Sequence, residues 1–164
     1  TFFVAHHGYS AATAGTLFSG YFLVQGVTQP GIGALSDRIG RDAAASLTVG
    51  LGLLGYGLLV VGTGLEMVLL GVGLTGVSMG WGAALMPKVM DHLDEHERSA
   101  GFGLFRTAYM MLGATGSVVT GFVADFFGWD VAFLGLAGLL VGMLGVLLRI
   151  LWQHQTARRM HAAS

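Results

Sequence analysis

Long apolar stretches, separated by short polar connections, dominate this sequence. A helix needs about 20 mostly apolar residues to cross the hydrocarbon core of a bilayer. Only 10% of the residues are charged, whereas soluble domains carry about 25%. A soluble protein of this composition has too few polar side chains to cover its surface, so we predict an all-α integral membrane protein. The expected membrane domain covers residues 11–152, with transmembrane helices at 11–32, 43–62, 67–87, 101–124 and 131–152.

Glycine is abundant, with 28 residues, while proline occurs only twice. Glycine weakens a helix in water but lets helix backbones approach closely in a membrane. A glycine-rich elastic protein is excluded because the glycines lie inside Leu- and Val-rich runs. Three patterns predict close packing seams between helices: Gly76/Gly80, Gly113-x-x-x-Ser117-x-x-x-Gly121 and Gly138/Gly142.

The charges are distributed unequally between alternate connections of the five predicted helices. The segments expected on one side hold every basic residue: Arg38, Arg41, Lys88, Arg98, Arg106, Arg149, Arg158 and Arg159. The opposite connections hold Glu66, Asp125 and Asp130 and no basic residue. Basic residues mark the cytoplasmic side of membrane proteins. We therefore expect a multi-pass protein of the plasma membrane, with residues 1–10 as an extracytoplasmic lead and residues 153–164 as a cytoplasmic tail.

The connection Gly33–Asp42, with the sequence GALSDRIGRD, contains the most distinctive pattern in the chain. We expect it to be a loop, with Asp42 capping the next helix. Its spacing recurs further on: Gly33-x-x-x-Asp37-x-x-Gly40 is echoed by Gly121-x-x-x-Asp125-x-x-Gly128, and the capping Asp42 is echoed by Asp130. The charge distribution places the two copies on opposite membrane faces. This arrangement is typical of an inverted repeat of three helices.

GALSDRIGRD resembles the signature loop of the major facilitator superfamily: Gly, three residues, Asp, Arg, one residue, Gly, Arg and then usually a basic residue. The matching residues are Gly33, Asp37, Arg38, Gly40 and Arg41. Asp42 departs from the pattern, which weakens the basic cluster but leaves the turn intact. The stretch GSVVTGFVADFFGWDVAF also resembles the junction between the last two helices of a half of these transporters.

The resemblance implies a transporter of twelve helices in two halves, each half built from two inverted triplets. This chain would be one six-helix half without most of its first helix, and residues 1–10 would end that missing helix or loop. We favour the C-terminal half, because the third span lacks an arginine and the fourth lacks a Gly-Pro pair that the N-terminal half often carries. The N-terminal half is the alternative.

The resemblance also implies roles for the signature residues. Asp37 would help to latch the two halves together on the cytoplasmic side, facing a helix of the missing half. Arg38 and Arg41 would fix the topology, contact anionic lipid and brace the latch. Gly33 would permit close packing, and Gly40 a tight reversal. The competing interpretation is a tight turn without a role in gating.

Polar residues form a stripe on the first predicted helix. Tyr21, Gln25 and Gln29 recur every four residues, so they share one face that should point away from lipid. We interpret this face as the lining of a substrate cavity, together with Trp81 and Tyr109. Hydrogen bonding between helices is the alternative.

Arg106 is expected a turn or two inside the fourth helix, where a charge is costly. Snorkelling to the interface, or pairing with Glu97 or Asp94, is the interpretation we favour over substrate binding. Glu97 and Arg106 are therefore candidate charges of a cytoplasmic gate.

Other chemistries find little support in the sequence. The chain has no cysteine, which excludes disulfides and thiolate metal sites. His92 and His96 are four residues apart but lie in a solvated acidic loop, so we expect no metal site. With no nucleotide loop and no nucleophile constellation, we predict no enzyme activity, no cofactor and no nucleic-acid partner.

The sequence thus predicts secondary active transport of a small solute by alternating access. The expected partners are the solute, the lipid bilayer and the missing other half of the same transporter. A membrane receptor or assembly subunit on the same scaffold is the alternative. A channel is less well supported, because the polar stripes are too short to line a continuous pore.

Overall fold

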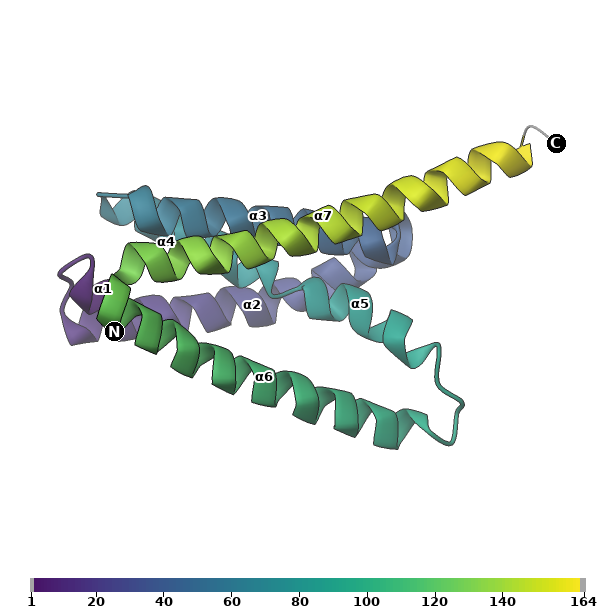
Figure 1. The fold of residues 1–164 in the computed structure, drawn as a ribbon, viewed down its shortest axis with the longest axis horizontal. Coiled ribbons are helices and arrows are strands. Elements are labelled where there is room, and N and C mark those ends of the chain that lie inside the picture. The colour runs from purple at the N-terminus through teal and green to yellow at the C-terminus, as the bar shows by residue number, and fades with distance from the viewer. Residues whose placement is uncertain (1, 163–164) are drawn as a thin grey trace.

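A computed structural model describes residues 2–162, and these residues are helical apart from short connections (Figure 1). The helices are α1 (Phe2–Ala5), α2 (Ala11–Ile39), α3 (Arg41–Val61), α4 (Leu65–Ser78), α5 (Trp81–Met90), α6 (Arg98–Phe127) and α7 (Trp129–Ala162). The long helices lie side by side and alternate in direction, so that successive connections fall at opposite ends of the bundle (Figure 1). The predicted all-helical fold is confirmed.

Within residues 2–162, four helical segments are long and apolar enough to cross a membrane: Arg41–Val61, Leu65–Met90, Arg98–Phe127 and Trp129–His154. They correspond to the last four of the five predicted spans. The first predicted span lies in α2, which is not among these four segments. α2 has 29 residues but carries more serine, threonine and glutamine than the other long helices. The helices begin before and end after most of the predicted spans, and the predicted tail continues α7 as helix to Ala162.

The prediction of a loop over Gly33–Asp42 is wrong. α2 continues to Ile39 and α3 begins at Arg41, so the chain reverses at Gly40 alone. Gly40 has φ of +94°, a conformation that L side chains rarely adopt, and its N–H donates to the Ser36 carbonyl at 3.0 Å. Asp42 consequently lies in the first turn of α3 and is not its N-cap.

The echo of this turn has the same geometry at the other end of the bundle. α6 continues to Phe127, where a loop was predicted, and the chain reverses at Gly128 with φ of +91°. The Gly128 N–H donates to the Ala124 carbonyl at 3.0 Å, as Gly40 does to Ser36. Asp130, predicted as a cap, lies in the first turn of α7.

The third predicted span is broken into α4 and α5 at Met79 and Gly80. A Cβ at Gly80 would lie 2.0 Å from Ile32 Cδ1, and one at Gly76 would lie 2.9 Å from the Tyr21 carbonyl oxygen. The predicted Gly76/Gly80 seam is therefore confirmed, and α2 is the helix packed against it.

The most extensive packing between two helices is that of α3 against α4. A Cβ at Gly52 would lie 2.6 Å from Ser78 Cβ, and one at Gly55 would lie 2.9 Å from the Gly71 carbonyl oxygen. The other two predicted seams are wrong within the described part of the chain. Apart from the nearby backbone of its own helix, no described heavy atom lies within 4 Å of the Cβ position of Gly113, Gly121, Gly138 or Gly142.

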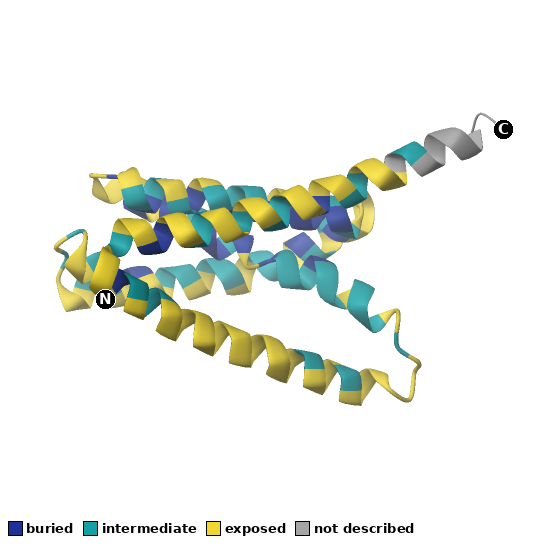
Figure 2. Ribbon diagram, viewed as in Figure 1, coloured by how far each residue is buried: buried dark blue, intermediate teal, exposed yellow. Residues whose placement is uncertain are grey.

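α6 is the least buried of the long helices, as its exposed surface in Figure 2 shows. Ala124 is its one buried residue. It meets α7 near their shared turn and diverges from the other helices toward its beginning at Arg98 (Figure 1).

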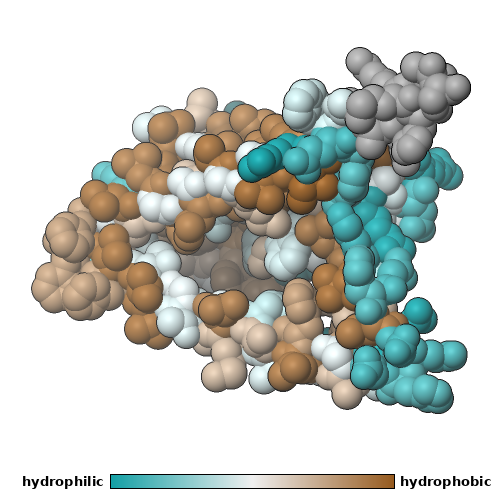
Figure 3. Space-filling view, turned by 45° about the vertical axis from the view of Figure 1, so that its right-hand side comes forward, coloured by the Kyte–Doolittle hydropathy of each residue, from teal (hydrophilic) through white to brown (hydrophobic). Residues whose placement is uncertain are grey.

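Hydrophilic residues gather at one end of the molecule, while brown apolar residues cover much of the surface between the ends (Figure 3). The basic residues Arg38, Arg41, Lys88 and Arg98 lie at helix termini that meet at this end. Glu66 and Asp130 lie in first turns at the other end. The separation of charge predicted from the sequence is therefore present in the fold.

Candidate functional site

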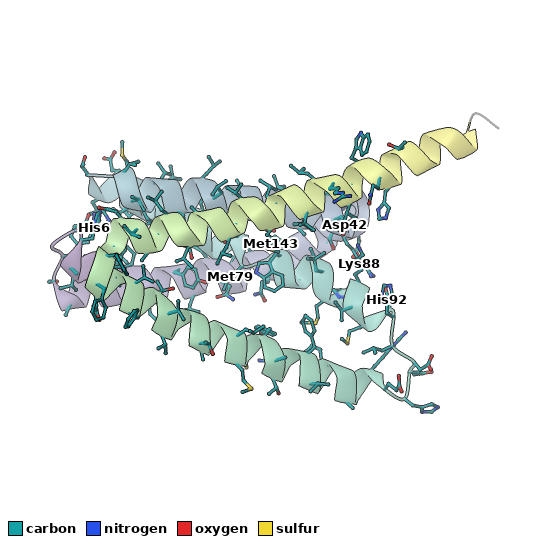
Figure 4. The ribbon with its side chains drawn as sticks, viewed as in Figure 1. His6, Asp42, Met79, Lys88, His92 and Met143 are labelled. Carbon is teal, nitrogen blue, oxygen red and sulfur yellow. The ribbon has the colours of Figure 1, made fainter. Side chains whose placement is uncertain are left out.

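A pocket of about 270 Å³ lies between α2, α5 and α6. Its lining residues are Gln25, Gln29, Met79, Trp81, Gly82, Ala83, Met86, Phe102 and Tyr109. Four of the five residues predicted to line a cavity are therefore brought together, and Tyr21 is the exception. Met79, which was not among the predicted cavity residues, lies midway along the bundle (Figure 4). We call this space the mid-bundle pocket.

Two local features place these side chains around the pocket. Gln25 and Gln29 are one turn apart on α2 and so face the same side. The break between α4 and α5 lies directly before Trp81, which opens α5. Gly80 permits the break to lie close against Ile32, and Met79 and Trp81 on either side of it both reach the pocket.

Gln25 is the most unusual member of the mid-bundle pocket. Its Oε1 atom is buried and has no hydrogen-bond partner among the described residues. A carboxamide oxygen can accept two hydrogen bonds. Leaving a buried acceptor unpaired costs about 1–3 kcal/mol. The oxygen is therefore available for a donor that enters the pocket.

Tyr21 lies one turn before Gln25 in α2 and lines a different space, which has a volume of about 440 Å³. The residues around this second pocket are mostly aromatic or aliphatic: Phe2, Phe3, Phe18, Tyr21, Phe22, Tyr56, Leu59, Val72, Thr75, Ser117 and Phe133. The predicted polar stripe is thus divided between two pockets. Ser78, the last residue of α4, is buried against Gly52 and donates to the Thr75 carbonyl at 2.7 Å.

A cluster of charged residues forms at the hydrophilic end of the bundle, and we call it the charged cluster. Lys88 Nζ on α5 donates to Asp42 Oδ1 on α3 at 2.6 Å. His154 Nδ1 on α7 lies 3.6 Å from Asp42 Oδ2, and Arg41 pairs with Asp91. Asp42 is only 8% exposed, so these contacts compensate for the burial of its carboxylate. Asp42 and Lys88 are labelled in Figure 4.

Asp42, Lys88, Asp91 and His154 were not singled out as functional from the sequence. The one available signal was that Asp42 departs from the basic residue usual in the signature. Lys88 lies 46 residues away from Asp42 along the chain, so the pairing requires the fold to be known.

The residues predicted to form the latch lie near this cluster but behave differently from one another. Asp37 and Arg38 are exposed in the last turns of α2 and make no ion pair among the described residues. Arg41 is half-buried by its contact with Asp91. No atom lies within 4 Å of the Cβ position of Gly33, so its predicted close packing is not found within the described residues.

The two predicted gate charges are also separate from the cluster. Glu97 is exposed directly before α6, and Arg106 is exposed further along that helix. No ion pair joins Arg106 to Glu97 or Asp94 in the described part of the chain, so that predicted pairing is wrong there. The predicted cytoplasmic arginines Arg158 and Arg159 have side chains that the structure does not describe.

Comparisons with known proteins agree on one family. The sequence model of the Major Facilitator Superfamily matches residues 1–163. The chain is 29% identical to the tetracycline resistance protein, class B, of Escherichia coli over 68% of its own length and 28% of that protein. It is 26% identical to a probable hexose phosphate transport protein of Chlamydia pneumoniae over 85% of its length and 31% of that protein.

A third relative is the uncharacterized MFS-type transporter YhcA of Bacillus subtilis (strain 168), 30% identical over 79% of this chain and 24% of that protein. No solved structure matches the chain significantly. The chain therefore spans between about a quarter and a third of the length of these curated relatives.

Proposed function

This chain belongs to the major facilitator superfamily, a family of membrane transporters and not of enzymes, and on that premise we propose that it forms part of a secondary active transporter. The transporter moves a small solute across the membrane by alternating access, without hydrolysing ATP. The mid-bundle pocket is the observation that carries this proposal beyond family membership. It brings four predicted cavity residues together midway along the bundle, which is where transporters of this kind bind their solutes.

We further propose that the chain supplies five transmembrane helices of one six-helix half, with α4 and α5 forming a single broken span. The matched turns at Gly40 and Gly128 support two inverted triplets, because both reverse the chain through a glycine of the same positive φ at opposite ends of the bundle. The favoured assignment is the C-terminal half, for the sequence reasons given above. The exposed surface of α6 is consistent with a helix that packs against the other half.

The proposed orientation places residues 1–10 outside and the helical end of α7 in the cytoplasm. The basic residues at the hydrophilic end support it. In this arrangement Asp37 is the latch residue on the cytoplasmic side, supported by Arg38 and Arg41. The exposure of Asp37 leaves its carboxylate free to contact the other half. Glu97 and Arg106 remain candidate gate charges on the same side.

The proposal is tested with the full-length transporter reconstituted into vesicles. Tetracycline and hexose phosphates are suitable trial solutes, because two relatives are named for them. The Asp37→Asn variant should insert normally but lose most of the transport rate. Normal transport by that variant would reject the latch, while no transport of any solute by the wild type would favour a receptor or assembly subunit.

A further inference from the structure

We propose that the mid-bundle pocket binds an uncharged, ring-bearing part of the solute, from which an N–H or O–H group donates a hydrogen bond to Gln25 Oε1. This inference rests on the proposed transport function and specifies the chemical class of the solute. The residues of this chain that line the pocket form one wall of the solute site. This wall supplies the hydrogen-bond acceptor and the surfaces that contact the ring.

The absence of cationic side chains along this wall excludes an anionic group of the solute from it. Among the described residues, none of those lining the pocket is Asp, Glu, Lys, Arg or His. A carboxylate or phosphate moved from water to this wall would lose its hydration without gaining a cation. The charged cluster, whose members pair with one another, lines a separate pocket.

Gln25 determines which polar group of the solute this wall recognises. Its Oε1 is a buried acceptor without a partner among residues 2–162, so binding of a solute donor removes an existing energetic cost. A site that holds such an acceptor discriminates strongly against an analogue without the donor, since the analogue leaves the acceptor unpaired. We therefore expect a preference of about ten-fold for the donor-bearing solute.

The remaining side chains suit a flat ring. Trp81, Phe102 and Tyr109 provide aromatic surfaces, on which rings pack in offset or edge-to-face arrangements. Met79 and Met86 are flexible thioethers that adapt to rings of different outline. A volume of about 270 Å³ is near the lower end of the range for ligand pockets, so this wall accommodates a small ring system.

The test uses the full-length transporter in lipid nanodiscs and a matched set of probes. 2-Quinolinone is flat and uncharged and carries one N–H donor, its N-methyl derivative lacks the donor, and quinoline-2-carboxylate is anionic. Binding of each probe is measured by equilibrium dialysis. The wild type should bind 2-quinolinone about ten-fold more tightly than the N-methyl derivative, and should bind the carboxylate most weakly.

The Gln25→Met variant preserves the side-chain volume and removes the acceptor, so it should bind the two uncharged probes equally. Gln153→Met, on an exposed part of α7, is the control and should keep the wild-type preference. Size-exclusion chromatography shows whether each variant is folded.

The proposal is overturned by equal wild-type affinity for the two uncharged probes, by undetectable binding of 2-quinolinone, or by tighter binding of the carboxylate. Equal affinity is also the result expected if the other half of the protein pairs with Gln25. Transport of other solutes, measured in vesicles, would still support the proposed function after any of these outcomes. If the wild type transported no solute at all, both the proposed transport function and the proposed solute class would be rejected.

Discussion

The charged cluster and the mid-bundle pocket differ in how their polar atoms are matched. In the cluster, Asp42 contacts Lys88 and His154, and Arg41 contacts Asp91. In the pocket, Gln25 Oε1 is buried and has no hydrogen-bond partner in the part of the chain that the structure describes. Breaking a buried ion pair is strongly destabilising, whereas removing an unpaired acceptor removes a cost. The charged cluster thus links α3, α5 and α7, whereas the mid-bundle pocket contains an acceptor that the proposed solute would pair.

The largest expected change in the free energy of unfolding follows a substitution in the charged cluster. Asp42→Ala should destabilise the protein by about 3 kcal/mol, near the lower end for a broken buried pair, because the Lys88 side chain is partly exposed. Thermal unfolding of the full-length protein in detergent measures the loss. The Asp42→Ala/Lys88→Met double variant should lose less than the sum of the two single variants. If the stability losses of the two single variants simply added in the double variant, Asp42 and Lys88 would not be coupled. The charged cluster would then not differ from the mid-bundle pocket in how its polar atoms are paired.

The next largest change in stability is expected at Gly80, which lies in the break between α4 and α5 beside the mid-bundle pocket. Gly80→Ala should cost about 1 kcal/mol, at the low end for overpacking, because the Ile32 Cδ1 methyl that its Cβ would meet can rotate aside, while the Val77 carbonyl oxygen at 3.1 Å cannot. Gly82→Ala, in the first turn of α5, is the matched control. It meets no atom within 4 Å, and alanine favours helix over glycine by about 1 kcal/mol. If the two variants had equal stability, the close approach of α2 to the break would not constrain the fold.

A smaller effect of opposite sign is expected at Gln25. Gln25→Met should raise the free energy of unfolding by up to about 1 kcal/mol, since it replaces an unpaired buried acceptor with an apolar side chain of similar length. The same thermal assay measures it, with Gln153→Met as control. A clear loss of stability would mean that the Gln25 amide is satisfied in the whole transporter, and the two regions would no longer differ.

The smallest effect is expected at His154. Its side chain is 62% exposed and lies 3.6 Å from Asp42, so His154→Ala should change stability by less than about 0.5 kcal/mol. Lys88→Met in the same assay provides the comparison. A His154 effect as large as that of Lys88 would place the main support of Asp42 on α7 instead of α5.

Sequence reasoning identified the features that depend on local periodicity. The four-residue spacing of Gln25 and Gln29 predicted a shared face, and both residues line the pocket. The turn glycines Gly40 and Gly128 were recognised because the spacing around them repeats. Features that depend on distant contacts were missed, including the pairing of Asp42 with Lys88.

The errors in helix boundaries have a similar cause. Charged and polar residues from Gly33 to Ile39 resembled a loop, but helices exposed to water at a membrane surface tolerate such residues. One positive-φ glycine is sufficient for the reversal. The break at Met79 and Gly80 was likewise unpredictable, because the close contact of Gly80 with Ile32 on α2 appears only in the folded bundle.

The most direct test of the account is transport of 2-quinolinone into vesicles that contain the full-length protein. Wild type and Gln153→Met should transport it at the same rate, while Gln25→Met should be as stable as wild type or more stable, and should transport it at about one tenth of that rate. Transport by Gln25→Met at the wild-type rate, or no transport by the wild type, would contradict the assignment of the mid-bundle pocket as the solute site.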